Sequence, residues 1–521
     1  MISCRWFSRA DAVFVAALVI VAGICTYIGI ALPLGSFADD AFFLLGNAYR
    51  VAGGQIPHVD FSSPWGPVIF LIEATGLHLS GMRPNGLGYS NALFGSLIAI
   101  WAFFVARARW SPAVGCVAGV YTLLLIVAPF VLGGYPRDFS YAMIYNRYGY
   151  ALLGIVLLEC AGDMLSAKDR VRPPVGFAVS TGVALGLLLF LKISYALVAM
   201  AFVVALPLAG SAGGWRRLAA MFGGFALVAV AALSYLRFDL RDMLQDLTMA
   251  ASSRAPALKP LTLTGIVCLE NAALVILAAI MRTYRAAFVA WLTIGIGGVV
   301  LVTNQQLGGF PLDAYAALAL AGAYVPYSEY RQKWPAGIAL ATVLCVLPLG
   351  EASVISLTSA ALHWPPQPGA TLAMPERDAV LTFAPFVGKV KTETDGVEYV
   401  EDLNDGLNLL RRHLDKREGV LTFDQFNPFD YILDLPAPRG GFAAAAYDYI
   451  FDNAYHPSAE RFFGNAVYVL VPKYKKRALD RYEEDGDTLA LLRIYGSALR
   501  ARFAVVGETK HWVLWRRKTN E

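Results

Sequence analysis

Charge is scarce in this sequence. Only 16% of its 521 residues are Asp, Glu, Lys or Arg, whereas 57% are hydrophobic. A soluble globular chain carries about 25% charged residues, so the composition excludes a protein that is soluble throughout. The shortage is uneven, because residues 358–521 hold more than half of the charged side chains. We therefore predict a transmembrane domain at 1–357 and a water-soluble domain at 358–521.

Cysteine is also scarce. None of the six cysteines lies in the predicted soluble domain, and no two are spaced as CxxC. The chain thus offers no disulfide framework and no cysteine metal motif. The six histidines show no HExxH spacing, which is the signature of a zinc protease helix. The sequence leaves the cofactor unknown.

Long apolar runs fill the first domain. A helix needs about 20 apolar residues to cross roughly 30 Å of hydrocarbon. Arg5 and Arg9 precede the first run, which resembles an uncleaved signal anchor because it is too long for a cleaved signal peptide. We predict about eleven transmembrane helices, at 11–33, 84–106, 111–133, 148–165, 174–191, 193–210, 218–236, 261–281, 286–303, 310–328 and 334–355.

Basic residues indicate the orientation of these spans. They gather in the turns at 107–109, 168–172, 216–217, 282–285 and 331–333. With eleven spans, all these turns and the N-terminus lie on one side, and the positive-inside rule makes that side cytoplasmic. The apolar stretch 65–80 would break this agreement as a further span, so we interpret it as an interfacial or re-entrant helix. Since topology accounts for the basic residues, we predict no nucleic-acid partner.

The first outer loop begins with two adjacent acids, Asp39 and Asp40, in "GSFADDAFFLLGNAYRVAGG". Helical spacing follows them, and Gly53 and Gly54 end that helix. The pair has two interpretations. It caps the helix, which favours an acid at its N-terminus, or it serves a reacting proton or a divalent cation. His58 and Asp60 follow in the same loop and are further candidates for binding a substrate or a cation.

Other polar residues lie at the predicted outer ends of spans. The second loop holds Arg137, Asp138, Asn146 and Arg147 among tyrosines. An arginine there either holds a phosphate through its planar fork or pairs with Asp138. Lys192 lies between two apolar runs on the outer side, where it either snorkels to the headgroups or meets a phosphate. The segment 237–260 is amphipathic, as an ordinary interfacial helix or as a lid over a lipid groove.

The soluble domain reads as α/β. A helix at 398–414 places Leu403, Leu407 and Leu410 on one face, and "GVLTFDQF" and "AVYVLVP" are typical of strands. The end of the chain, from 502 to 517, predicts a closing hairpin. We find no nucleophile triad or phosphate-cradling loop in this domain, so we expect it to shape an acceptor site.

The whole pattern of spans and loops over residues 1–355 resembles the GT-C glycosyltransferases, polytopic membrane enzymes that use polyprenyl-phosphate-linked sugars. The resemblance implies that Asp39 is the catalytic base or a metal contact, with Asp40 beside it and Asp138 as a further acid. It also implies that Lys192 meets the donor phosphate. The expected fold is a polytopic α-helical GT-C-like membrane domain with a C-terminal periplasmic α/β domain.

The resemblance implies transfer of a sugar from a polyprenyl-phosphate donor to an envelope glycan, lipid or protein. The site is expected at the outer face of a bacterial cytoplasmic membrane, with a cytoplasmic N-terminus. Two alternatives stay open at this point. A lipid-linked glycan transporter or flippase would bury its acids at mid-membrane. A non-catalytic envelope assembly protein would have no groove that joins Asp39 to Lys192.

Overall fold

The computed structural model describes most of the chain. The described residues are 9–31, 34, 37, 39–128, 132, 140–165, 175–208, 215–253, 265–302, 310–324, 369–383, 396–414, 418–473 and 486–519. The predicted span 334–355 and the acidic loop residue Asp138, together with Arg137, lie outside them.

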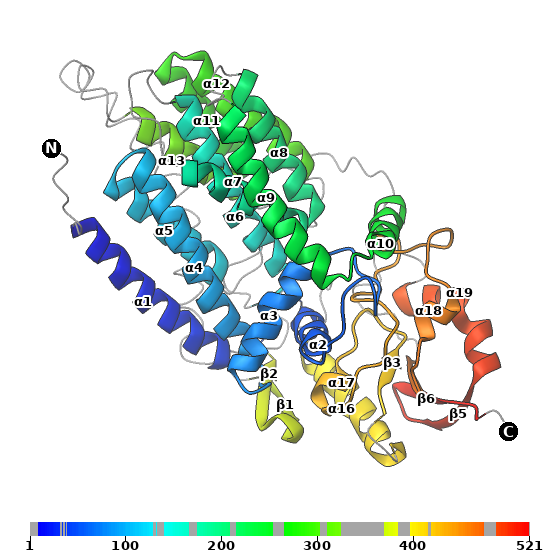
Figure 1. Ribbon diagram of the computed structural model, residues 1–521. Coiled ribbons are helices and arrows are strands. Elements are labelled where there is room, and N and C mark those ends of the chain that lie inside the picture. Colours follow the sequence, from blue (N-terminus) through cyan, green and yellow to red (C-terminus); the bar gives the residue numbers. More distant parts are fainter. Residues whose placement is uncertain are drawn as a thin grey trace.

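A bundle of apolar helices forms the first domain (Figure 1). Helices α4, α6 and α9 are long and apolar enough to cross a membrane. The predicted helical membrane domain is confirmed in outline, whereas the count of eleven spans stays a prediction. The bundle contains α1 (Arg9–Ala31), α4 (Gly86–Arg109), α5 (Pro112–Val127), α6 (Ile144–Leu165), α7 (Val175–Leu189), α8 (Ile193–Leu208), α9 (Trp215–Tyr235), α11 (Gly265–Met281), α12 (Tyr284–Trp291), the π-helix η1 (Leu292–Val302) and α13 (Leu312–Tyr324).

Three of the basic turns, those at 107–109, 216–217 and 282–285, meet at one end of this bundle. Arg109 and Arg217, from two different turns, both form ion pairs with Asp163 near the end of α6. Arg285 donates to the carbonyl of the next residue, Met164, at 3.1 Å. These turns therefore share one end of the bundle, as the sequence predicts. The side of the membrane that this end faces stays a prediction.

Helices α7 and α9 pack with their backbones in close contact. A Cβ added to Gly182 of α7 would lie 1.9 Å from the Met221 carbonyl oxygen, and one added to Gly224 of α9 would lie 2.2 Å from that of Val179. Small residues allow this approach between membrane helices, where dispersion forces hold the pair.

Gly224→Ala should therefore destabilise the bundle by about 1–3 kcal/mol, because the new methyl group forces two backbones apart. The neighbouring Gly223 is the matched control, since a Cβ there meets no atom within 4 Å. Gly223→Ala should leave stability unchanged or raise it slightly. Thermal unfolding of both variants in detergent measures this difference. Equal unfolding temperatures would show that the close packing contributes nothing.

The outer-loop segment forms two short helices, α2 (Asp40–Ala52) and α3 (Pro67–Leu79). The 13 residues of α3 extend about 20 Å, less than the hydrocarbon thickness, which supports the interfacial assignment of 65–80. Pro67 at the first turn of α3 starts this helix, since its fixed φ suits a helix N-terminus.

The C-terminal domain contains two sheets, and its predicted α/β character is confirmed. Strands β1 (Ala370–Met374) and β2 (Ala379–Phe383) form an antiparallel pair. A four-stranded sheet has the order β3-β4-β6-β5, in which only β3 and β4 are parallel. The four strands of this sheet and the helices of the domain are α16 (Gly396–His413), β3 (Val420–Thr422), α17 (Phe429–Ile432), α18 (Ala459–Phe463), β4 (Tyr468–Pro472), α19 (Gly486–Arg502), β5 (Phe503–Glu508) and β6 (Trp512–Arg517).

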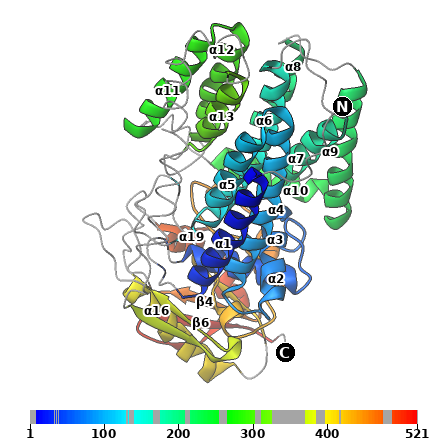
Figure 2. The ribbon, with the colours of Figure 1, turned by 90° about the vertical axis from the view of Figure 1, so that its left-hand side faces the viewer.

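Helix α2 lies between the bundle and the C-terminal domain, at the end opposite the basic turns (Figures 1 and 2). Buried Asn47 donates to the Ala443 carbonyl at 2.8 Å. Arg50 donates to the carbonyls of Pro438 and Gly440 at 3.0 and 2.7 Å. These contacts fix the helix that carries Asp40, and the adjoining Asp39, against the C-terminal domain.

Candidate functional site

One cavity of about 380 Å³ lies where the outer-loop helix, the bundle and the C-terminal domain meet. It contains both acids of the predicted pair and the predicted cation Lys192. Its remaining walls are largely apolar and aromatic. The residues that line it are Phe37, Asp39, Asp40, Phe43, Pro64, Trp65, Met143, Tyr145, Asn146, Lys192, Ile193, Ser194, Leu247, Ala250, Ala251, Gln425, Phe426, Ala444, Ala446, Tyr449 and Ile450.

Asp39 occupies the N-cap position of α2 but does not use its side chain as a cap. Its backbone is αR, and its carboxylate accepts no capping hydrogen bond from α2. Its backbone carbonyl accepts the first hydrogen bonds of the helix, from the amides of Phe42 and Phe43 at 2.9 and 3.3 Å. Asp39 is only 9% exposed and borders the cavity. Capping therefore does not account for this carboxylate.

Burial determines the ionisation of Asp40. It raises the pKa of Asp40 well above its ordinary value, and the adjacent Asp39 carboxylate raises it further. The Asp40 carboxyl group is therefore suited to holding a proton beside the cavity.

Lys192 reaches the cavity from the turn between α7 and α8. Its ammonium donates to the Asn146 side-chain oxygen at 3.1 Å. It also lies 5.1 Å from the ring centroid of Tyr145 and 5.8 Å from that of Tyr195. An ammonium flanked by aromatic faces and an amide is suited to an anionic group that enters from the cavity.

The backbone of Lys192 is positioned by the first outer loop. The amide of Gly66 donates to the Leu191 carbonyl at 3.2 Å, and that of Val68 donates to the Phe190 carbonyl at 3.1 Å. The loop that leads from Asp39 into α3 therefore also holds the residues just before Lys192. These backbone hydrogen bonds connect the loop that follows the Asp39 carboxylate to the segment that carries the Lys192 ammonium, and both groups line the same cavity.

Other predicted site residues lie elsewhere. Arg147 is 1% exposed and does not border the cavity, although the preceding Asn146 does. His58 is fully buried and its Nδ1 lies 3.0 Å from Asp246. Asp60 accepts from the amide of Ile56 at 2.8 Å and lies 3.4 Å from the Arg439 guanidinium. None of these three residues is among those that line the cavity.

The sequence missed several walls of the cavity. Trp65 and Tyr145 pack against each other with tilted rings, whose centroids are 5.2 Å apart. Gln425 and Tyr449 enter from loops of the C-terminal domain, and the Gln425 backbone amide donates to the Asp424 carboxylate at 2.9 Å. Gln425 lies within the predicted strand "GVLTFDQF", whereas β3 ends at Thr422, so no signal in the sequence assigns Gln425 to the site.

A divalent cation needs several oxygen ligands. Within the described part of the chain, no group of three or more His, Cys, Asp or Glu side chains is arranged to hold a metal ion. Asp39 and Asp40 alone do not make up such a set, so they do not fit the predicted cation as a complete site.

The helical bundle, the outer-loop helix and the C-terminal α/β domain together have the fold of a solved membrane protein. The structure that carries this assignment is ArnT from Cupriavidus metallidurans bound to undecaprenyl phosphate. It matches with a TM-score of 0.50 and 15% identity, over 97% of this chain and 98% of that one. The likeness establishes the fold, and it confirms the predicted resemblance.

Two further solved structures are similar but less close. ArnT from the same organism in the apo state has a TM-score of 0.48 at 14% identity, over 97% of this chain and 98% of that one. The Archaeoglobus fulgidus oligosaccharyltransferase in complex with Zn and sulfate has a TM-score of 0.38 at 13% identity, over 91% and 70%. No protein-family model matches the chain, and no curated protein matches it.

Proposed function

We propose that this protein is a glycosyltransferase that moves a sugar from a polyprenyl-phosphate donor to an envelope glycan, lipid or protein. The observation that carries the proposal is a single cavity that is lined by both Asp39 and Lys192. Sugar transfer needs a base for the acceptor and a cation for the phosphate leaving group, and this partly apolar cavity offers both. The fold shared with ArnT, a protein that binds undecaprenyl phosphate, supports a lipid-linked donor.

The chemistry follows from these positions. Asp39 takes the proton of an acceptor hydroxyl or amine as that atom attacks the anomeric carbon of the sugar. The bond between this carbon and the phosphate oxygen breaks, and its electron pair leaves with the polyprenyl phosphate. Lys192, oriented by Asn146, stabilises the negative charge that develops on that oxygen. Inversion at the sugar is implied by the family resemblance.

The C-terminal domain contributes to acceptor binding in this proposal. Gln425 both donates and accepts hydrogen bonds, so its amide suits the hydroxyls of a sugar. Tyr449 and Phe426 offer aromatic surface in the same cavity. We place the site at the outer face of a bacterial cytoplasmic membrane, with the N-terminus cytoplasmic and the C-terminal domain periplasmic.

The two alternatives receive less support. The acidic pair lies on α2, packed beside the C-terminal domain, and not midway along a bundle helix. This position favours an enzyme over a transporter, whose acids belong at mid-membrane. An assembly protein has no need for a cavity that holds both a carboxylate and an ammonium. Incubation with labelled polyprenyl-phosphate sugars tests the proposal, which predicts loss of label from the lipid.

Lys192→Met should weaken undecaprenyl phosphate binding by roughly 10- to 100-fold, the worth of a hydrogen bond to a charged group. Methionine keeps the apolar stem but removes the charge. The control is Lys473→Met in the C-terminal domain, since Lys473 pairs with exposed Glu508 and lies outside the cavity. Binding of undecaprenyl phosphate to both purified variants measures the effect. Wild-type affinity in Lys192→Met would leave headgroup snorkelling as the role of this lysine.

A further inference from the structure

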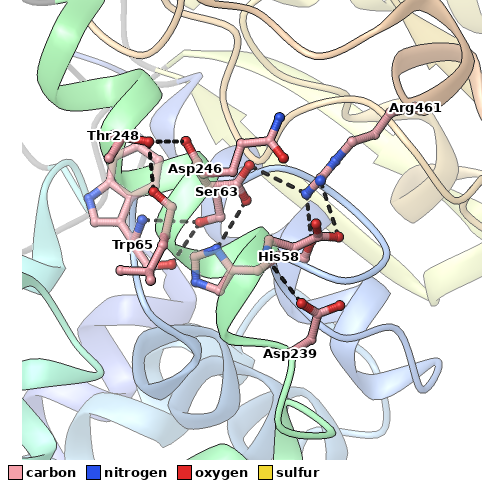
Figure 3. Close-up of polar contacts among 10 residues, drawn as sticks. His58, Ser63, Trp65, Asp239, Asp246, Thr248 and Arg461 are labelled. Carbon is pink, nitrogen blue, oxygen red and sulfur yellow. Dashed lines mark hydrogen bonds and ion pairs between the residues drawn. The ribbon is translucent and has the colours of Figure 1, made fainter.

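A polar cluster joins three distant parts of the chain beside the cavity. It consists of His58 in the first outer loop, Asp246 in α10 (Leu240–Ser253) and Arg461 in α18; we call it the 58–246–461 cluster (Figure 3). His58 Nδ1 lies 3.0 Å from Asp246, and the Arg461 guanidinium lies 3.4 Å from it. Arg461 also donates to the His58 carbonyl at 2.6 Å. Each member therefore contacts the other two.

Asp246 is the centre of this cluster. It is 2% exposed, and its carboxylate also accepts the backbone amide of Ser63 at 2.9 Å. A carboxylate removed from water is stable only with partners that replace its hydration. Because those partners come from the outer loop and from the C-terminal domain, Asp246 fixes α10 against both.

Two walls of the cavity depend on this fixation. On α10, the residues that follow Asp246 include Leu247, Ala250 and Ala251, which line the cavity. On the outer loop, the Ser63 hydroxyl donates to the Trp65 carbonyl at 2.8 Å and accepts the Trp65 amide at 3.1 Å. Trp65 is itself a cavity residue and packs on Phe43 at 4.8 Å. Asp246 is thus connected to the cavity residue Trp65 through hydrogen bonds of one intervening residue, Ser63.

The same loop continues to the phosphate end of the cavity. Gly66, next to Trp65, holds the carbonyl of Leu191, the residue before Lys192. The path from Asp246 through Ser63, Trp65 and Gly66 to Lys192 is made of buried or half-buried contacts throughout. A shift of the cluster would therefore move both the α10 wall and the backbone that presents the ammonium.

We propose that Asp246 is a positioning residue for the lipid-phosphate substrate, acting through His58, Ser63 and Arg461 to set the walls of the cavity. This inference rests on the proposed function, since it concerns the same site. Asp246 touches no reacting atom. Its loss should impair binding and orientation of the substrate more than the chemical step.

The chain offers a matched control on the same helix. Asp242 lies one turn earlier and pairs with the same guanidinium at 3.1 Å, but it is 28% exposed, whereas Asp246 is 2% exposed. Exposed ion pairs contribute little. Asp242→Asn removes a charge from the same partner without disturbing the buried contacts.

His58 supplies a second pair of variants. Its backbone has φ of +71°, a conformation that Asn adopts more readily than most residues. His58→Asn keeps a nitrogen donor near the position of Nδ1 and tolerates this φ. His58→Leu removes the donor and leaves the Asp246 carboxylate short of a partner.

The experiment measures undecaprenyl phosphate binding, KM and kcat of folded, purified protein, with hydrogen exchange of residues 240–253 as a readout that needs no lipid. Asp246→Asn should weaken binding and raise KM by roughly tenfold or more, a coupling expected within one buried network, with a smaller change in kcat. Exchange in α10 should become faster. Asp242→Asn and His58→Asn should stay near wild type, whereas His58→Leu should follow Asp246→Asn.

Opposite outcomes overturn the inference. A folded Asp246→Asn protein with wild-type binding, KM and α10 exchange would show that the cluster positions nothing. If Asp246→Asn does not fold, equal lipid binding and equal exchange in His58→Leu and His58→Asn would also show that the cluster positions nothing. Wild-type protein that binds no undecaprenyl phosphate would instead overturn the proposed function, and the exchange readout would still decide whether the cluster holds α10.

Discussion

Asp39→Asn should lower the rate of sugar transfer by roughly 10²- to 10⁴-fold, the usual contribution of a general acid or base, while leaving the free energy of unfolding near that of the wild type. Asparagine cannot take a proton from the acceptor. It caps a helix about as well as aspartate, and the Asp39 side chain makes no capping hydrogen bond here. Turnover of a labelled polyprenyl-phosphate sugar and thermal unfolding, measured together, check both parts of this result.

Asp40→Asn is the matched control for that variant. Burial and the charge of Asp39 raise the pKa of Asp40 well above its usual value, so a neutral amide resembles the protonated form of this side chain. Asp40→Asn should therefore reduce the rate less than Asp39→Asn does. An inactive Asp40→Asn enzyme beside an active Asp39→Asn enzyme would assign the base to Asp40. Full activity in both would remove the pair from the mechanism.

Gly66→Ala should be the most disruptive small substitution near the cavity. A Cβ at Gly66 would lie 2.0 Å from the Phe190 carbonyl oxygen and 2.4 Å from its carbon. The backbones must separate, which breaks the hydrogen bonds that hold Phe190 and Leu191. We expect destabilisation of about 1–3 kcal/mol or more, and weaker undecaprenyl phosphate binding in the folded fraction because Lys192 moves with its neighbours.

The control for Gly66→Ala is Gly23→Ala in α1, where a Cβ meets no atom within 4 Å. This second variant should match the wild type in unfolding temperature and in lipid binding. Normal binding by a folded Gly66→Ala protein would show that the loop does not position Lys192. Thermal unfolding and a lipid-binding titration of the two variants distinguish these outcomes.

The sequence predicted the residues that local pattern can reveal. Asp39 and Asp40 stand out after a long apolar run, and Lys192 stands out against the positive-inside trend. Asn146 and Arg147 are adjacent, but successive helix residues point about 100° apart. Only Asn146 therefore borders the cavity, whereas Arg147 is buried in the bundle. The sequence alone does not show which of two adjacent polar residues points into the cavity and which points into the bundle.

The remaining walls depend on pairings between residues far apart in the chain. His58 and Asp246 are separated by 188 positions, and Arg461 lies 215 positions beyond Asp246. Hydrophobic periodicity reports which face of a helix is apolar, but it carries no information on which distant charge will meet it. Gln425 and Tyr449 were missed for the same reason, because they lie in loops whose course only the folded chain defines.

The placement of α2 between the bundle and the C-terminal domain has a consequence for biosynthesis. The contact of Asn47 with Ala443 spans 396 positions, so the helix beside the acidic pair is among the first segments synthesised and among the last to find its partners. Domains generally fold from the N-terminus during synthesis, and contacts of such separation form late. A chain arrested before residue 443 lacks one wall of the cavity, so the ribosome must nearly finish before the cavity is complete.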